Sequence, residues 1–265
     1  MIKLSQKSGG SMRFIVLKKK TIAIVFAALL VCATLILSFS ESGAASVYFG
    51  NTLRRVPVYR VATEEKKVAL TFDAAWGADK TEGIMNILKE YEADATFFLV
   101  GFWMESYADM TKAIAQNGFE IGSHSNTHPH MSRLETADVI SELTVSVSKI
   151  KGLTDQEVKL FRAPFGEYND RVIEGAESLG LTTIQWDVDS LDWKNLAAID
   201  IVTRVVSKAK EGSIILFHNN SDHILTVLPA VLTALKDKGF SFVRVSNLIY
   251  QDNYYIDNTG EQHRK

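Results

Sequence analysis

The chain has 265 residues, of which 46% are hydrophobic and 23% charged, a composition that is ordinary for a globular protein and excludes a disordered or collagen-like chain. Its single Cys excludes a disulfide framework and a Cys-rich zinc module. The formal net charge of −2 is the sum of two unlike parts. Residues 1–40 contain six basic residues and no acidic residue, whereas residues 41–265 contain 23 basic and 31 acidic residues. So acidic a body lacks the positive surface that nucleic-acid binding requires.

The N-terminal region contains an apolar run, residues 21–39, directly after Lys18, Lys19 and Lys20. A run of this length can cross a bilayer core of about 30 Å. Lysines on one flank favour that flank remaining in the cytoplasm. Residues 1–40 are therefore predicted to form a cytoplasmic stub and a transmembrane anchor, with the body outside the membrane. The alternative is a signal sequence that is cleaved near residue 45, which would give a secreted body.

Two polar stretches flank the region with regular periodicity. Residues 41–65 are predicted to be a connector, in which Pro57 and the alternating pattern of residues 56–61 indicate an extended stretch of edge-strand type. Residues 251–265 form a polar tail without periodicity, and we expect this tail to be loosely held. The remaining residues, 66–250, are predicted to form one domain.

Within this domain, short apolar runs rich in β-forming residues alternate with helical patterns. The predicted strands are residues 68–72, 95–100, 119–123, 158–161, 182–186, 213–217 and 241–245. The predicted helices are residues 80–91, 107–117, 137–151, 170–179, 199–210 and 223–238. This alternation indicates parallel strands with crossover helices, arranged as an open doubly wound sheet or as a closed barrel. The first strand is not followed by GxGxxG, which disfavours a dinucleotide-binding fold.

Ionisable side chains stand at the ends of five of the seven predicted strands. They are Asp73, His124 with His128, Arg162, Asp187 and His218. In a parallel β/α barrel the residues just past the strand ends converge on one face, where the chemistry takes place. An open sheet would bring together only those near its switch point. The pattern therefore favours a barrel with one polar site.

His124 and His128 are four residues apart in a short turn before Pro129. This spacing within one helical turn places two imidazoles on the same side, which suits a metal ion. The alternative is a surface histidine cluster. His130, although close in sequence, is not predicted to be a ligand.

Asp73 ends an apolar strand, where a carboxylate is costly to bury unless it has a partner. Arg162 is a suitable counter-ion, which would keep the carboxylate ionised. The alternative for Asp73 is that it caps the N-terminus of the following helix, but Asp79 is better placed for that role. The alternative for Arg162 is a purely structural salt bridge.

His218 follows the apolar strand of residues 213–217. A lone histidine there is often a core residue, but its predicted position on the same face as Asp73 and His124 favours a general acid. Residues 186–193 hold three acids and two tryptophans. This combination suits a sugar-binding rim, whereas the alternative is a solvated acidic loop.

Five short motifs occur in a fixed order along the chain. They are Thr71-Phe-Asp73, His124-Ser-x-x-His128, Arg162-x-Pro-Phe165, Asp189-x-x-Asp192-Trp193 and Leu216-x-His218. In this order they resemble the polysaccharide deacetylase (NodB-homology) domain of carbohydrate esterase family 4, over about residues 66–250. With the anchor and the segment TFDAAWG, the chain more narrowly resembles the PdaB-type, sporulation-associated branch.

The resemblance implies a distorted (β/α)7 barrel that binds one divalent metal, usually zinc. It implies His124 and His128 as ligands, Asp73 as general base, Arg162 as the residue that tunes it, His218 as general acid and Asp192 as the residue that orients it. It also implies an oxyanion contact from the Phe165 backbone N–H and an acetyl pocket formed by Trp193 and Leu216, and Trp76 is predicted to contact the substrate as well.

The function implied is removal of N-acetyl groups from cell-wall glycan, at N-acetylglucosamine or N-acetylmuramic acid, by a monomer attached to the membrane. One residue departs from the family pattern. Where the family usually has an Asp as third metal ligand, this chain has Ala74, which cannot coordinate, and catalytic zinc normally has three protein ligands.

Ala74 leaves three outcomes open. In the first, the site binds metal weakly through two histidines and waters. In the second, Asp73 or another acid, such as Asp187 or Asp222, takes the place of the missing third ligand. In the third, the domain has lost its deacetylase activity. The last outcome gives the alternative function, a catalytically impaired glycan-binding protein at the membrane. A hydrolase of other small amides on the same scaffold is a third possibility.

Overall fold

The computed structural model describes residues 4–8, 11–15, 20–21, 24–30, 54–194 and 196–265. The chain divides into two units, Met1–Leu53 and Arg54–Lys265. In the first, β1 (Leu4–Ser8) and β2 (Ser11–Ile15) form an antiparallel hairpin, and residues 24–30 are helical. The predicted anchor lies largely outside the described residues. Among the residues described, no helix combines the length and the apolar character needed to cross a membrane.

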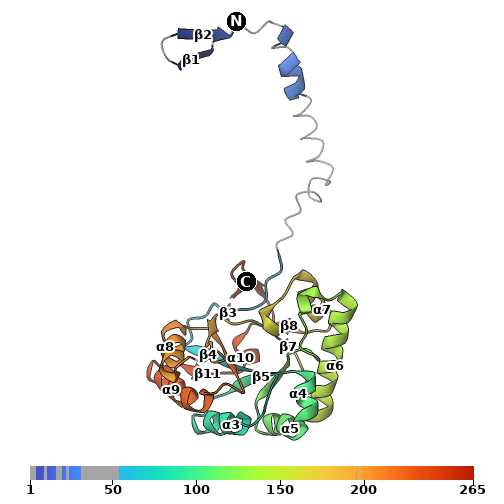
Figure 1. The fold of residues 1–265 in the computed structure, drawn as a ribbon, viewed down its shortest axis with the longest axis vertical. Coiled ribbons are helices and arrows are strands. Elements are labelled where there is room, and N and C mark those ends of the chain that lie inside the picture. The colour runs from blue at the N-terminus through green and yellow to red at the C-terminus, as the bar shows by residue number, and fades with distance from the viewer. Residues whose placement is uncertain (1–3, 9–10, 16–19, 22–23, 31–53, 195) are drawn as a thin grey trace. The chain divides into compact units, whose positions relative to one another are not determined.

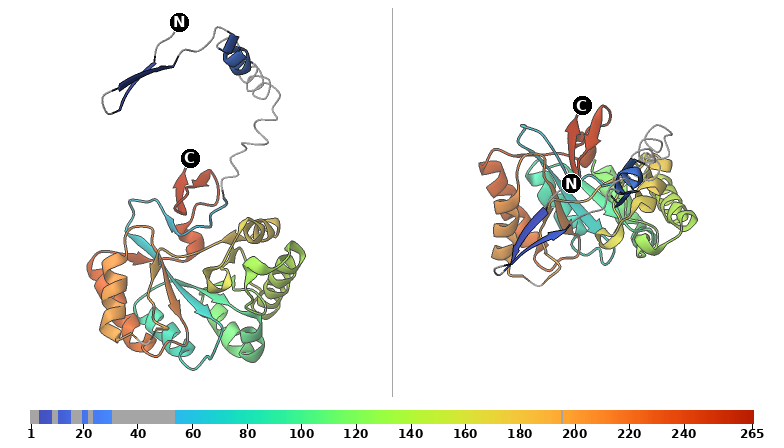
Figure 2. Two further views of the ribbon diagram at one scale, coloured as in Figure 1. Left: turned by 45° about the horizontal axis from the view of Figure 1, so that its top comes forward. Right: turned by 90° about the horizontal axis from the view of Figure 1, so that it is seen from above.

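The second unit is built on a parallel sheet with helices on its outer side (Figures 1 and 2). Its strands are β4 (Lys67–Ala74), β5 (Ala95–Leu99), β6 (Glu120–Ser123), β7 (Leu160–Phe161), β8 (Thr182–Thr183), β9 (Val188–Asp189), β10 (Ile214–His218) and β11 (Ser241–Phe242). Their order is β8-β7-β6-β5-β4-β10-β9, and β11 pairs with the start of β4.

The helices of this unit are α3 (Thr81–Glu90), α4 (Gly101–Ser106), α5 (Ala108–Gln116), α6 (Thr136–Thr154), α7 (Asp170–Ser178), α8 (Ala198–Lys208), α9 (Ile224–Asp237) and α10 (Val245–Leu248). Two 3-10 turns, η1 (Met131–Arg133) and η2 (Pro164–Gly166), lie in the loops. Within residues 66–250 each predicted helix and strand has a counterpart, whereas β9, α4 and α10 were not predicted. The parallel α/β architecture expected from the alternating pattern is therefore confirmed.

The expected closed barrel is a curled, open sheet instead. Edge strands β8 and β9 are two residues long each, and no pairing between them occurs in the described part of the chain. Residues 58–61 lie between the two edges: Val58 forms a bridge with Ile184, beyond β8, and Arg60 with Ser213, before β10. Closure of the barrel is thus replaced by a strap from the N-terminal end of the unit.

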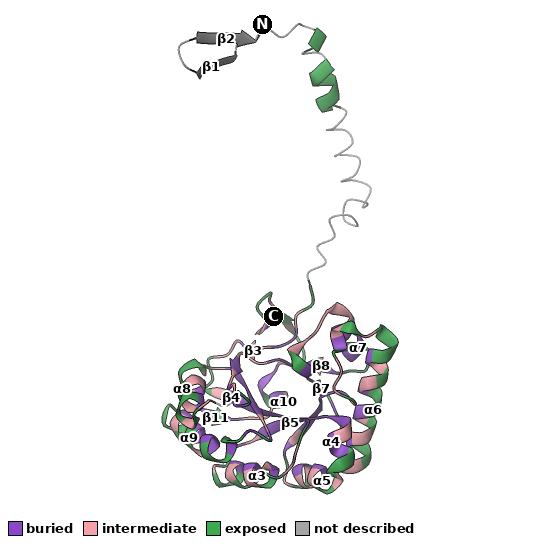
Figure 3. Cartoon of the chain, viewed as in Figure 1, coloured by how far each residue is buried: buried purple, intermediate pink, exposed green. Residues whose placement is uncertain are grey.

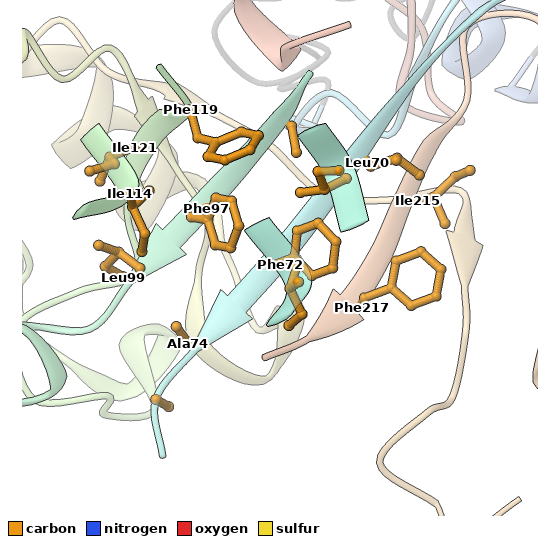
Figure 4. Packing of buried hydrophobic residues seen from close by; sticks show 14 of the residues in the cluster. Leu70, Phe72, Ala74, Phe97, Leu99, Ile114, Phe119, Ile121, Ile215 and Phe217 are labelled. Atoms are coloured by element: carbon orange, nitrogen blue, oxygen red, sulfur yellow. The ribbon is translucent and has the colours of Figure 1, made fainter. Parts of the chain in front are cut away.

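Alternation along β4 divides its side chains between two environments. Leu70, Phe72 and Ala74 pack beneath the helices, where the Phe72 ring stacks 5.0 Å from that of Phe97 and 5.7 Å from that of Phe217 (Figures 3 and 4). Asp73 lies on the opposite face of the strand, inside the curled sheet. The apolar core beneath the helices therefore fixes the strand whose inner face carries the predicted base.

The C-terminal residues differ from the loosely held tail that the sequence suggested. β12 (Tyr254–Ile256) and β13 (Glu261–Arg264) form a hairpin, and β13 pairs in parallel with β3 (Arg60–Val61). Residues 54–65, expected as a connector, accordingly pack within the folded unit. The edge-strand character expected for residues 56–61 is present at β3.

Gln262 anchors this hairpin from a fully buried position. Its side chain accepts a hydrogen bond from the Tyr250 N–H at 2.8 Å and donates one to the Tyr250 carbonyl at 2.9 Å. Replacing Gln262 with Ala should lower the free energy of unfolding by about 1–3 kcal/mol for each backbone group left unpaired, measured by urea denaturation. The matched variant Gln251→Ala, at an exposed residue of the same segment, should be close to wild type, and equal stabilities for the two variants would contradict the anchoring role.

Candidate functional site

A cleft with a volume of about 560 Å³ opens at the carboxyl ends of the parallel strands. The ionisable residues predicted for catalysis or metal binding that line it are Asp73, His124, His128 and His218. The predicted substrate contacts that line it are Trp76, Phe165, Trp193 and Leu216. Arg162 and Asp192 are buried behind these residues. The structure thus brings together the ten residues predicted to act in catalysis, metal binding or substrate contact, in or directly behind the cleft.

Arg162 holds the Asp73 carboxylate in a fully buried ion pair. Its Nη1 donates to Asp73 Oδ1 and to Thr71 Oγ1, both at 2.8 Å, and its Nη2 donates to the Gln185 carbonyl at 3.1 Å. Burial by itself raises the pKa of Asp73, but the charges of Arg162 and of nearby histidines outweigh it, so that the pKa is lowered. Asp73 is therefore an ionised carboxylate with Oδ2 left for chemistry.

His124 is oriented by the same segment that carries Arg162. Its Nδ1 lies 2.8 Å from the Arg162 carbonyl, which can only accept, so the proton is on Nδ1. Its Nε2 lies 3.6 Å from Asp73 Oδ2. Burial lowers the pKa of His124 despite the nearby Asp73, so the ring is neutral and Nε2 carries a lone pair.

The loop of residues 124–128 is shaped by one side chain of the predicted motif, Ser125, and by one outside it, Glu142. His128 has a φ of +57°, and its backbone N–H donates to Ser125 Oγ at 2.9 Å. Glu142 on α6 accepts the N–H groups of Asn126 and Thr127 at 2.8 Å each. Burial lowers the pKa of His128 to about 4, which keeps this imidazole neutral too. The centroids of the two imidazole rings are 5.1 Å apart.

Two neutral imidazoles beside an ionised carboxylate form a donor set that fits a divalent metal. His124 and His128 would hold the ion, with Asp73 Oδ2 as the neighbouring oxygen. Ala74 contributes no donor, and its side chain belongs to the apolar core beneath the helices rather than to the cleft.

The other acids considered as replacement ligands point elsewhere. Asp187 accepts hydrogen bonds from Ser213 Oγ at 2.8 Å and from the Ile214 N–H at 2.9 Å. Asp222 is exposed and lies 3.5 Å from Lys80. Neither of these acids lines the cleft. The hypothesis that Asp187 or Asp222 replaces the missing metal ligand is therefore wrong. Of the acids proposed from the sequence, Asp73 is the one that lies in the cleft.

His218 faces the cleft from the end of β10 and is held by Asp192. Asp192 Oδ1 accepts from His218 Nδ1 at 2.8 Å, and Oδ2 accepts the backbone N–H of His218 at 2.9 Å. Burial lowers the pKa of His218, but the hydrogen bond and charge of Asp192 outweigh it, and the pKa is raised. A proton on Nε2 is therefore retained to higher pH than for an ordinary histidine, as a general acid requires.

Three exposed aromatic side chains form the walls of the cleft. Trp76 and Phe165 flank His128, with ring centroids 5.1 Å and 4.6 Å from the imidazole, and Trp193 stands beyond His218 on the loop after β9. Large aromatic side chains that remain exposed in this way present flat apolar surfaces to a ligand. His130, which was not predicted to be a ligand, stacks on Phe165 at 4.5 Å.

Several residues that shape the site were missed from the sequence. Glu142 and Gln185 act through hydrogen bonds to residues distant along the chain, and short motifs carry no signal for such contacts. Thr71 belongs to the first motif but was assigned no role, and it accepts a hydrogen bond from Arg162. Trp186 lies in the predicted aromatic and acidic segment and lines the cleft, as does Asn220.

The chain is similar to several known proteins. A family model described as polysaccharide deacetylase matches residues 60–184. The uncharacterized protein YlxY of Bacillus subtilis is 34% identical over 75% of the chain, and the chain spans only 62% of that relative's length. A peptidoglycan-N-acetylglucosamine deacetylase of Bacillus cereus is 33% identical over 72% of the chain and 92% of its own length. A crystal structure of a CE4 family pseudoenzyme from Bacillus anthracis superimposes with a TM-score of 0.71 at 32% identity, over 79% of this chain and 73% of that one.

Proposed function

Because this chain belongs to the polysaccharide deacetylase family, a family of hydrolases, we propose that it removes N-acetyl groups from cell-wall glycan. The observation that carries the proposal is that one aromatic cleft contains a carboxylate whose pKa is lowered, Asp73, and a histidine whose pKa is raised, His218. Arg162 favours the ionised form of Asp73, and Asp192 raises the pKa of His218. Two groups whose surroundings push their pKa values apart are suited to act as base and acid in one hydrolysis.

Amide hydrolysis needs an activated water, a polarised carbonyl and a proton for the departing amine. Asp73 Oδ2 accepts the proton of the attacking water, while Arg162 keeps the carboxylate in place. His218 Nε2 donates its proton to the amide nitrogen as the C–N bond breaks, which releases acetate and the free amino sugar. The backbone N–H of Phe165 is proposed to donate to the carbonyl oxygen as it gains charge.

The family generally depends on a divalent metal, and we propose zinc held by His124 and His128. Such an ion, when bound, supplies Lewis acidity and lowers the pKa of water. Because Ala74 supplies no donor, solvent or Asp73 would have to provide the further ligands. The Arg162 carbonyl orients the His124 ring, and Ser125 Oγ holds the backbone N–H of His128.

The substrate class follows from the aromatic walls and the relatives. Trp76, Phe165 and Trp193 suit the apolar faces of sugar rings, and the Bacillus cereus relative is named for peptidoglycan N-acetylglucosamine. We propose peptidoglycan N-acetylglucosamine or N-acetylmuramic acid as the deacetylated sugar. The basic flank and apolar run of residues 18–39 support a membrane-attached body outside the cytoplasm, or a secreted one after cleavage near residue 45. The resemblance to the PdaB-type branch supports a role in sporulation.

A second candidate, a catalytically impaired glycan-binding protein, is favoured by Ala74 and by the likeness to a pseudoenzyme. Acetate release from peptidoglycan and from N-acetylglucosamine oligomers separates the two candidates, when metal content is measured on the same purified full chain. Turnover that requires metal supports the deacetylase. Glycan binding without acetate release under any added divalent metal establishes the second candidate, and absence of both activities overturns both.

The pH dependence of the reaction should report on the contact between His218 and Asp192. The pKa of His218 is raised above 6.5, with Asp192, Asp73 and Asp189 as the carboxylates that face it, so activity is lost as pH rises through that raised value. Asp192→Asn removes the nearest negative charge. We expect it to lower the pKa and to move the alkaline limb of kcat by about 1 unit towards lower pH.

The control for this pH experiment is Asp252→Asn, at an exposed residue outside the cleft. This variant should leave the pH profile unchanged. An alkaline limb that stays in place in Asp192→Asn would show that His218 is not the titrating acid.

A further inference from the structure

Phe165 has a backbone conformation that bulky residues rarely adopt. Its φ is +58° and its ψ is 6°, in the left-handed region, and Gly166 follows with a φ of +68°. A non-glycine residue in this region costs about 1–3 kcal/mol and persists only where its surroundings enforce it. The Phe165 side chain is 55% exposed, so burial of the ring does not offset that cost.

The neighbouring residues Gln185 and Trp186 hold this turn. Gln185 is buried, and its Nε2 donates to the Gly166 carbonyl at 3.1 Å. Trp186 packs so closely on Gly166 that a Cβ at that position would come within 3.0 Å of its ring. Besides its own backbone hydrogen bonds, from the N–H groups of Gly166 and Glu167, the turn is therefore held by a buried amide and by the close packing of Trp186.

Gln185 is itself fixed on both sides of its backbone. Its N–H donates to the Val58 carbonyl at 2.7 Å, in the strap of residues 58–61, and its carbonyl accepts from Arg162 Nη2 at 3.1 Å. The residue that holds the turn is thus tied to the guanidinium that holds Asp73. Gln185 therefore connects Arg162, the partner of the general base Asp73, to the turn that carries the Phe165 ring.

We propose that Gln185 is a positioning residue that fixes the Phe165–Gly166 turn and so holds the Phe165 ring as a rigid wall of the cleft beside His128. The ring lies 4.6 Å from the His128 imidazole and stacks on His130, so a small rotation of the turn displaces it from the cleft. The ligand for this wall is the apolar face of a sugar ring, and in that respect the inference rests on the proposed function. A preformed wall avoids the entropic cost of ordering an exposed aromatic side chain on binding.

The test is a double-mutant cycle read out by binding, which needs no turnover. Gln185→Met keeps the size of the side chain and removes the donor, and Phe165→Ala removes the wall. Affinity for N-acetylglucosamine oligomers, measured by calorimetry, should fall about tenfold in each single variant. The double variant should bind no more weakly than Phe165→Ala, because Gln185 acts through Phe165.

The matched control is Gln156→Met. Gln156 also uses its side-chain amide to hold backbone groups, at Phe119 and Ile121, away from the cleft. This variant should bind the oligomer as the wild type does, even if its stability falls as much as that of Gln185→Met. Wild-type affinity in Gln185→Met, or additive losses in the double variant, would overturn the positioning role.

Failure of the proposed function gives a different result. If the wild-type chain binds no oligomer, the ligand assignment is wrong, and amide hydrogen exchange over residues 163–167 then decides the role of Gln185. Faster exchange in Gln185→Met than in Gln156→Met supports that role, whereas equal exchange contradicts it.

Discussion

Replacing Arg162 with methionine is expected to lower the free energy of unfolding by about 3–5 kcal/mol, because the variant buries the Asp73 carboxylate without a counter-ion. Both side chains are almost inaccessible to solvent, and Arg162 Nη1 is the donor to Asp73 Oδ1 at 2.8 Å. Methionine fills much of the volume of the arginine stem, so the loss reports on charge rather than on a cavity. Urea denaturation of the full chain measures it, and acetate release should fall in parallel.

A double variant separates the charge effect from packing. With Asp73→Asn added to Arg162→Met, no unpaired charge remains, and we expect a large part of the lost stability to return. The surface variant Arg55→Met, which breaks an exposed pair with Glu174 at 3.2 Å, should cost at most about 1 kcal/mol. If Arg162→Met and Arg55→Met were equally stable, the buried ion pair would not be a main element of the fold.

The second large effect is expected on rate. His218→Ala removes the proton donor to the departing amine, and kcat should fall by about 10²–10⁴-fold, the range typical of a lost general acid. The side chain is partly open to the cleft, and Asp192 keeps a backbone donor at residue 218. The buried Asp192 carboxylate loses one of its two donors from residue 218, so stability should fall by about 1–3 kcal/mol, whereas KM should change much less than kcat.

A second histidine–aspartate pair in the chain provides the control. His263 Nε2 lies 3.1 Å from Asp257 in the C-terminal hairpin, outside the cleft. His263→Ala should keep wild-type kcat. Retention of more than about a tenth of the wild-type kcat in His218→Ala would rule out the acid role assigned to His218.

Features of the fold and of the site could be predicted where they depend on residues close together in the sequence. Strand ends rich in ionisable residues predicted the convergence of Asp73, His124, Arg162 and His218, because parallel strands place such ends together. The direction of individual side chains was not predictable in the same way. Asp187 looked equivalent to the others by position, yet it turns to Ser213 and Ile214.

Features set by distant partners escaped prediction altogether. β8 and β9 are too short for periodicity to show that the sheet stays open, and the C-terminal hairpin depends on its pairing with β3. Gln185 carries no local pattern, since its role comes from backbone groups of Val58, Arg162 and Gly166.

The strap of residues 58–61 also bears on the order of events in folding. β3 is the first strand of its unit and β13 the last, and their pairing joins Arg60 to Glu261. Contacts between the two ends of a chain are formed at a high cost in loop-closure entropy and depress the folding rate. The opening between β8 and β9 cannot receive its complete support until β13 is available to pair with β3. We therefore expect the closure of the strap to be a late step in the folding of this unit.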